Sequence, residues 1–146
     1  MIELKPYNES EYSAIKDYFP QNEIDKYTNR GGYRVLSLFA LYKSKFYLLW
    51  EDNKVIGCGV IRWKFSKEFK QFGWWLYAIW IHPQSRGTGR GVVLMNNLIE
   101  ELKRKRINKV RLNVDADNFV AQSLYKKIGF KVINQIKSQI YMQYDL

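Results

Sequence analysis

The hydrophobic and polar positions of the chain alternate between strand-like and helix-like periods. Residues 46–50 and 55–63 are rich in aromatic and β-branched side chains and flank turn formers at residues 51–54, which predicts a β-hairpin. Apolar residues at three- and four-residue spacing predict an amphipathic helix over residues 92–102. The predicted strands are residues 2–4, 46–50, 55–63, 74–81, 110–114, 130–133 and 139–144, and the predicted helices are residues 9–18, 21–27, 92–102 and 118–128.

This order, with hairpins first and alternating strands and helices afterwards, predicts an α/β (α+β) fold. The 146 residues are 47% hydrophobic and contain no repeat or Gly/Ser-rich linker, so we expect one domain over residues 1–146. The single cysteine, Cys58, cannot form an internal disulfide, which favours a cytoplasmic location. The start lacks the pattern of a secretory signal, and the apolar stretch at residues 72–81 is too short to cross a bilayer, so we expect no membrane association.

The charge of the chain points to an anionic partner. Lys and Arg number 24 against 14 Asp and Glu, giving a net charge of +10. Nucleic acid, an acidic membrane and a phosphorylated cofactor are all compatible with this excess. The basic run at residues 103–106 follows the predicted helix at residues 92–102, where positive charge complements the negative end of the helix dipole.

The most informative segment joins the strand at residues 74–81 to the next helix. The strand stops before Pro83, and a loop with three glycines opens the helix. Such a junction binds phosphate, because glycines let successive N–H groups converge and the helix N-terminus adds partial positive charge. The loop lacks the Gly-Lys-Ser/Thr ending of a Walker loop and fits the dinucleotide fingerprint poorly. Its residues are Arg86, Gly87, Thr88, Gly89, Arg90, Gly91 and Val92, and the alternative is a purely structural loop.

A second motif follows the next strand. Arg86-x-x-Gly89-x-Gly91 together with Asn118-x-x-Ala121-x-x-Leu124-Tyr125-x-x-x-Gly129-Phe130 resembles the paired motifs of the GNAT family of acetyl-CoA-dependent N-acetyltransferases. The resemblance implies a mixed, mostly antiparallel sheet, flanked by helices and splayed between residues 74–81 and 110–114.

The resemblance also implies a cofactor site for acetyl-CoA, with no metal. Residues 86–92 are expected to hold the pyrophosphate, and the backbone of Ile79, Trp80 and Ile81 is expected to pair with the pantetheine arm like an added strand. Asn118 is expected to contact the pantetheine, to cap the following helix, or to do both.

For the chemistry, the resemblance implies that Tyr125 is the general acid that protonates the departing thiolate. A phenol with a pKa near 10 suits that task, although a tyrosine packed in the core is the alternative. Many relatives carry a glutamate base on the splayed strands, including at the position of Asn113, and an amide cannot accept the proton. The base therefore stays open among Asp115, Asp117, Tyr77, His82 and a water chain.

The acceptor is expected to be an amine of a small molecule, a peptide or a protein, and the sequence does not identify it. A flexible loop at residues 30–33 and an aromatic cluster are considered as walls of the acceptor pocket, although aromatic strands more often belong to the core. It comprises Trp63, Phe65, Phe69, Phe72, Trp74 and Trp75, and the neighbouring Lys64, Lys67 and Lys70 argue against a polycationic acceptor. Two other classes of function remain as alternatives. One is a nucleic-acid-binding domain, which we expect less than the acetyltransferase, and the other is a CoA-binding sensor without turnover. The oligomeric state is open, a homodimer included.

Overall fold

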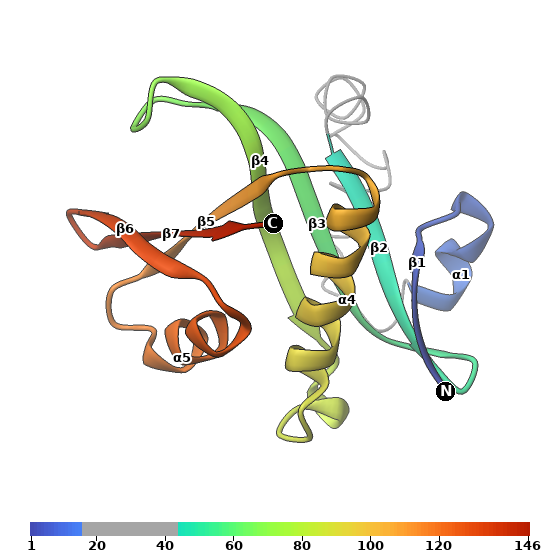
Figure 1. Cartoon of the computed structure of the whole chain (residues 1–146). Helices are drawn as coiled ribbons and strands as arrows, with labels where there is room; N and C mark the ends of the chain where they lie inside the picture. Colours follow the sequence, from blue (N-terminus) through green and yellow to red (C-terminus); the bar gives the residue numbers. More distant parts are fainter. Residues whose placement is uncertain (16–43) are drawn as a thin grey trace.

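The computed structural model describes residues 1–15 and 44–146. Its centre is a seven-stranded sheet of order β1-β2-β3-β4-β5-β7-β6, in which only β4 and β5 are parallel (Figure 1). The strands are β1 (Ile2–Pro6), β2 (Ser44–Glu51), β3 (Lys54–Ser66), β4 (Gln71–Ile81), β5 (Lys109–Asp115), β6 (Lys131–Ile136) and β7 (Gln139–Asp145). The helices are η1 (Glu9–Glu11), α1 (Tyr12–Ile15), η3 (Pro83–Ser85), α4 (Arg90–Arg104) and α5 (Phe119–Ile128).

The predicted strands are all present with somewhat different ends, and the mixed, mostly antiparallel sheet is confirmed. The predicted helix at residues 9–18 begins with η1 and α1, and its remainder lies outside the described residues. The helix expected at residues 21–27 and the loop expected at residues 30–33 also lie outside them. None of the described helices is long and apolar enough to span a membrane.

Two hairpins form the first half of the sheet. Asp52 and Asn53 connect β2 to β3 with φ angles of 48° and 69°, which match the two-residue turn that continues the twist of antiparallel strands. The β3–β4 hairpin is longer than its neighbours. Within the described residues, β2 pairs with β3 as far as Arg62, and beyond it the tip of the hairpin pairs with no other strand.

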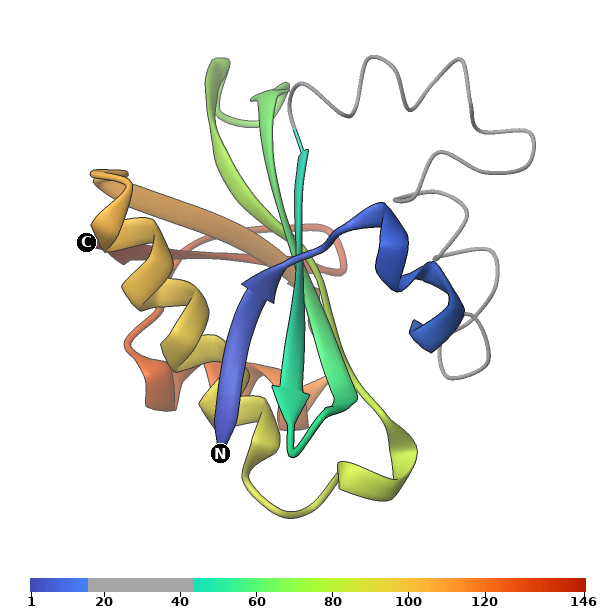
Figure 2. The same ribbon diagram turned by 90° about the vertical axis from the view of Figure 1, so that its right-hand side faces the viewer.

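The two faces of the sheet are covered differently, as Figure 2 shows with α4 on one side and α1 on the other. Helix α4 buries its apolar stripe, Leu94, Met95, Leu98, Ile99 and Leu102, against the main core. Each such side chain contributes about 1.5–3 kcal/mol by leaving water. The described part of the core on the opposite face includes Ile15 from α1 and Cys58 from β3.

Strands β4 and β5 meet at a single Cα pair, Trp75 with Arg111. Beyond it they separate, β4 towards the loop before α4 and β5 towards the turn before α5 (Figure 1). Strand β5 continues its ladder with β7 instead, from Lys109 opposite Asp145 to Asp115 opposite Gln139. The splay that the motifs imply between residues 74–81 and 110–114 is therefore present.

Candidate functional site

The edge of β4 that faces the splay leaves backbone groups without a strand partner. Past Trp75, β4 pairs with β3 on one side, but no pair joins it to β5 among the described residues. The register of β3 and β4 shifts between Leu76, opposite Ile61, and Ala78, opposite Val60, so Tyr77 is the extra residue of a β-bulge. An extended ligand can therefore add to this edge from the bulge to Ile81.

At the end of β4 the chain turns through a short, internally bonded loop. His82 caps η3, and its Nδ1 accepts a hydrogen bond from the Gln84 N–H at 3.3 Å. The Arg86 Nε donates to the Ile81 carbonyl at 2.7 Å, and its guanidinium lies 5.5 Å from the centre of the Trp80 ring. Arg86 thus ties the loop back onto the strand that precedes it.

The glycines expected to shape the loop do so through their backbone angles. Gly87 and Gly89 have φ angles of 74° and 81°, which side chains other than glycine adopt at a cost of about 1 kcal/mol. A Cβ built at either position meets no atom within 4 Å, so conformation and not crowding requires glycine there. Thr88, between them, donates through its hydroxyl to the Ser85 carbonyl at 2.7 Å.

Helix α4 begins with an open N-terminus. Gly89 is the N-cap residue and offers no side-chain hydrogen bond, and the first turn contains no acidic residue. The Val93 N–H donates to the Gly89 carbonyl at 3.2 Å. The N–H groups before it, from residue 90 to residue 92, have no acceptor within the helix and lie at the positive end of its dipole. This arrangement attracts an anion such as phosphate.

Arg90 is directed away from this N-terminus. Its Nη2 lies 2.5 Å from a carboxylate oxygen of Glu51 at the end of β2, and its Nε donates to the other oxygen at 3.1 Å. Its Nη1 also donates to the Thr88 carbonyl at 3.2 Å. Arg90 is therefore paired with a carboxylate, whereas the backbone amides and the guanidinium charge of Arg86 remain to attract an anion.

The second motif is placed against the first. Asn118 caps α5, where its Oδ1 accepts from the Ala121 N–H at 3.2 Å, so the capping role expected for it is present. A Cβ built on Gly91 would lie 3.6 Å from Leu124 Cδ2, which places α5 directly against the first turn of α4. The two motifs therefore form one surface beside the splay.

Tyr125 follows Leu124 on α5 and is half-buried. Its ring packs edge-on to Phe130 at 5.9 Å between centroids. Burial raises the pKa of the Tyr125 hydroxyl above its usual 10, because the charged phenolate is poorly solvated there. The hydroxyl therefore stays protonated at neutral pH, as a proton donor must.

The residues considered as a base differ in their surroundings. Asn113 is exposed on β5 and donates to Gln139 Oε1 at 2.8 Å, and Gln139 in turn donates to the carboxylate of Asp115. Tyr77 lies under the guanidinium of Arg62, 3.9 Å from its ring centre.

Two further base candidates lie in the turns that follow β4 and β5. The Nδ1 of His82 is occupied in the cap of η3. Asp117 lies in the turn before α5, where its carbonyl accepts from the Phe119 N–H at 3.1 Å.

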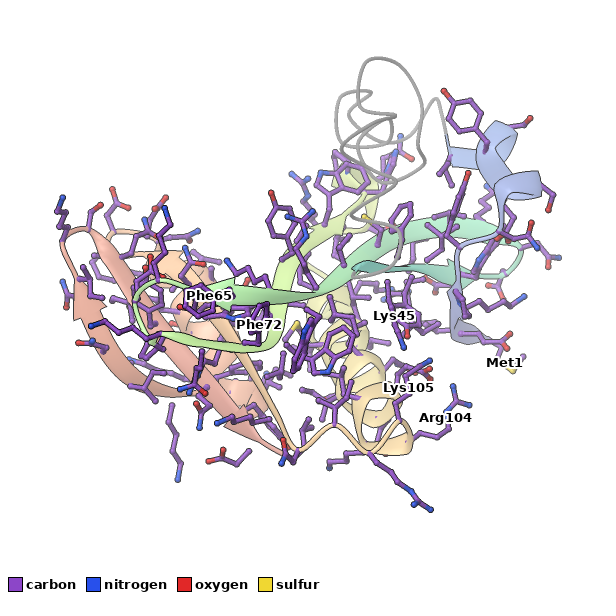
Figure 3. The ribbon with its side chains drawn as sticks, turned by 90° about the horizontal axis from the view of Figure 1, so that it is seen from above. Met1, Lys45, Phe65, Phe72, Arg104 and Lys105 are labelled. Carbon is purple, nitrogen blue, oxygen red and sulfur yellow. The ribbon has the colours of Figure 1, made fainter. Side chains whose placement is uncertain are left out.

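The aromatic cluster expected near the acceptor is divided between the two faces of the β3–β4 hairpin. Trp63, Phe65 and Phe72 are 37%, 50% and 53% exposed on one face, and Figure 3 shows Phe65 and Phe72 together at the tip. On the other face Trp75 is buried, and Phe69 packs 5.4 Å from the ring of Tyr141 on β7. The six aromatic side chains therefore do not form one cluster, because alternate residues of a strand point to opposite faces, and Trp75 is buried as the core alternative expects.

A contact that the sequence did not indicate joins the turn of this hairpin to β7. Ser66 Oγ donates to the Glu68 carboxylate at 2.9 Å. The same carboxylate interacts with the Tyr141 hydroxyl on β7, and burial together with Glu68 raises the pKa of that hydroxyl.

Within residues 1–15 and 44–146, no group of three or more His, Cys, Asp and Glu side chains is arranged to hold a metal ion.

The comparisons with known proteins agree with this geometry. Mycothiol acetyltransferase from Renibacterium salmoninarum is 40% identical over 55 residues, 38% of this chain and 16% of that protein. The enzyme of the same name from Corynebacterium glutamicum is 26% identical over 115 residues, 75% of this chain and 38% of that protein. The chain thus spans well under half the length of these curated relatives.

A solved structure is similar over the whole chain. The PaiA N-acetyltransferase from Thermoplasma acidophilum, solved in complex with coenzyme A, has a TM-score of 0.71 at 18% identity and covers 100% of this chain and 99% of that one. At that identity the likeness shows the fold. The model of the acetyltransferase (GNAT) family matches residues 8–130, which is most of the chain. The chain belongs to the acetyltransferase (GNAT) family.

Proposed function

We propose that this chain is an acetyl-CoA-dependent N-acetyltransferase that transfers an acetyl group directly to the amine of a small molecule or a peptide. The observation that carries the proposal is the junction at the end of β4. There an uncapped helix N-terminus and a loop with positive φ at Gly87 and Gly89 adjoin a strand edge that the splay leaves open.

These features fit coenzyme A in charge and in shape. The pyrophosphate would lie over residues 86–92, where the N–H groups of the first turn of α4 converge. The backbone of Ile79, Trp80 and Ile81 would pair with the amides of the pantetheine arm. Acetyl-CoA, when bound, supplies an activated thioester carbonyl. The chain's own contribution is to orient that group and to stabilise the charge that develops on its oxygen.

Protonation of the departing thiolate is assigned to Tyr125. Its raised pKa keeps the hydroxyl protonated, and its neighbour Leu124 packs α5 against the helix turn that would hold the pyrophosphate. Asn118 stabilises the start of α5 and, through it, the position of Tyr125.

The nucleic-acid alternative is weakened by the ion pairs at the end of α4. Lys103 lies 3.6 Å from Glu100, and Arg104 and Lys105 both pair with Glu101. The basic run is therefore partly neutralised within its own helix. No observation on the described residues favours this alternative over the acetyltransferase.

The test combines binding with turnover. Thermal shifts are measured with acetyl-CoA, CoA and short DNA, and thiol release from acetyl-CoA is followed across amino acids, peptides, polyamines and aminoglycosides. The proposal predicts stabilisation by both forms of CoA and amine-dependent thiol release. Stabilisation by DNA without any by CoA would contradict it, and CoA binding without turnover on any amine would favour the sensor.

A further inference from the structure

A row of charged and aromatic side chains crosses the sheet where the splay begins. Arg62 on β3 pairs with Trp75 on β4, Trp75 pairs with Arg111 on β5, and Arg111 pairs with Gln143 on β7. Paired residues in a sheet share a face, so all four side chains lie together. Their neighbours in sequence, Leu76 among them, belong to the core under α4, and the row therefore lies on the opposite face.

Arg111 is unusual within this row because its charge is buried without a carboxylate partner. The residue is only 8% exposed. The one hydrogen bond of its guanidinium within the described residues runs from Nε to the side-chain oxygen of Gln143 at 2.8 Å. Its Cζ also lies 4.6 Å from the centre of the Phe69 ring. Burying a charge is costly unless an opposite charge or several hydrogen bonds compensate it.

Two further cations lie near Trp75. Arg62 lies over the ring of Tyr77, and Lys64 lies 4.5 Å from the centre of the Trp75 ring. Among the described residues, the carboxylates of Glu68 and Asp115 accept hydrogen bonds from Ser66 and Gln139, and neither forms an ion pair with Arg111. Trp75, between the two arginines, has a buried indole N–H without a hydrogen-bond partner. The buried charge of Arg111, beside an indole N–H without a hydrogen-bond partner, indicates a ligand that supplies anionic oxygen.

The row also lies at the inner end of the open strand edge. Tyr77, the bulge residue, follows Trp75 by two positions, a separation of about 7 Å along a strand. Helices α4 and α5 pack against the other face, which leaves, among the described elements, the side of the row as the approach for an acceptor. Resting on the acetyltransferase function proposed above, we propose that the acceptor is a small amino-carboxylate. Its carboxylate is bound by Arg111, and its amine lies beside the bulge of β4.

The test compares acceptors that differ only in this charge. The protein amino acids, β-alanine and 4-aminobutyrate are each assayed beside their carboxamides, by CoA release and by calorimetric binding to the CoA-loaded protein. A carboxamide has the less basic amine, so it would be the better acceptor if the carboxylate were not recognised. We expect at least one carboxylate to exceed its carboxamide about tenfold or more in kcat/KM and in affinity.

Variants assign that preference to Arg111. Arg111→Gln is expected to remove the preference while the KM for acetyl-CoA stays unchanged, and Arg111→Lys is expected to keep part of it. Lys131→Gln, an exposed charge change on β6, is the matched control. The ratio of kcat/KM for a carboxylate to kcat/KM for its carboxamide, measured in one protein preparation, does not depend on how much of a variant is folded.

Each outcome is decisive. The inference would be overturned if the wild-type protein preferred no carboxylate over its carboxamide, or if no carboxylate bound. It would also be overturned if the preference survived in Arg111→Gln. Acetylation of amines without a carboxylate preference would leave the proposed function standing. Carboxylate binding that depends on Arg111 without any acetylation would instead overturn the proposed function and retain the recognition site.

Discussion

Trp75 on β4 and Arg111 on β5 face each other as a Cα pair, and within the described sheet no second pair joins these two strands. This single contact fixes where the sheet opens. On one side of it the backbone of β4 becomes available from Tyr77 to Ile81. The same contact holds Arg111, whose charge has no carboxylate partner, in place on β5. It thus positions both the edge of β4 that we assign to the pantetheine arm and the acceptor site that we propose.

The conformation of Gly89 provides a test of the loop. Gly89→Ala is expected to weaken CoA binding several-fold, because a φ of 81° strains an alanine by about 1 kcal/mol and the loop would relax away from its present shape. Gly73→Ala is the matched control, since a Cβ there also meets no atom within 4 Å and its φ is not in the left-handed region. Calorimetric titration with CoA measures the affinity of both variants. Equal affinities in the two variants would refute the loop assignment.

Replacing the same glycine by a carboxylate should have a larger effect. Gly89→Glu is expected to abolish CoA binding, since a negative charge would lie beside the N–H groups that are assigned to the pyrophosphate. The same titration measures this variant. Retained affinity would show that the anion binds elsewhere.

Tyr125→Phe is expected to lower kcat by about 100-fold or more while leaving CoA affinity unchanged, as loss of a general acid does. Because burial raises the pKa of Tyr125, the wild-type rate should fall only as the pH rises beyond 10, where the hydroxyl begins to lose its proton. Tyr144→Phe is the control, since Tyr144 also packs against Phe130, at 5.5 Å. A kcat for Tyr125→Phe equal to that of wild type across the pH range would exclude Tyr125 from the mechanism.

The pair between Glu51 and Arg90 predicts a pattern across variants. If Arg90 shapes the loop and does not contact phosphate, Glu51→Gln and Arg90→Gln should weaken CoA binding by similar, modest factors, and the double variant should be no worse than either. CoA affinities of the three variants measure this. A loss confined to Arg90→Gln would mean that Arg90 leaves Glu51 and contacts the cofactor directly.

The packing of α4 on β3 makes Gly59 sensitive to substitution. A Cβ at Gly59 would lie 2.6 Å from Leu98 Cδ1, closer than atoms can approach. Gly59→Ala is expected to lower the free energy of unfolding by about 1–3 kcal/mol, as overpacking of a core does. Urea denaturation measures it, with Gly73→Ala again as the control. An unchanged midpoint would show that α4 can shift without cost.

Much of the fold follows from local patterns in the sequence. The apolar spacing of α4 and the turn formers Asp52 and Asn53 predict their elements because neighbouring residues determine those structures. The splay was predicted through the paired motifs. The resemblance alone implied which strands would part, and no periodicity in the chain indicates it.

The side-chain contacts that refine the site could not be predicted in this way. The carboxylate that holds Arg90 lies 39 residues away in sequence, and the bulge at Tyr77 depends on the register of β3. Arg111 lay within an ordinary alternating strand, and only the fold shows that its charge is buried without a carboxylate beside it. These features depend on long-range packing, which a single sequence does not reveal.

The central claim, that the chain transfers acetyl groups from acetyl-CoA to an amine, is tested most directly by counting both products in one reaction. CoA release and acetylated amine are quantified together, with and without the acceptor. The account predicts that the two appear in equal amounts, that both depend on the amine, and that Gly89→Glu abolishes both. Release of CoA without an acetylated amine, or equal product from Gly89→Glu, would contradict it.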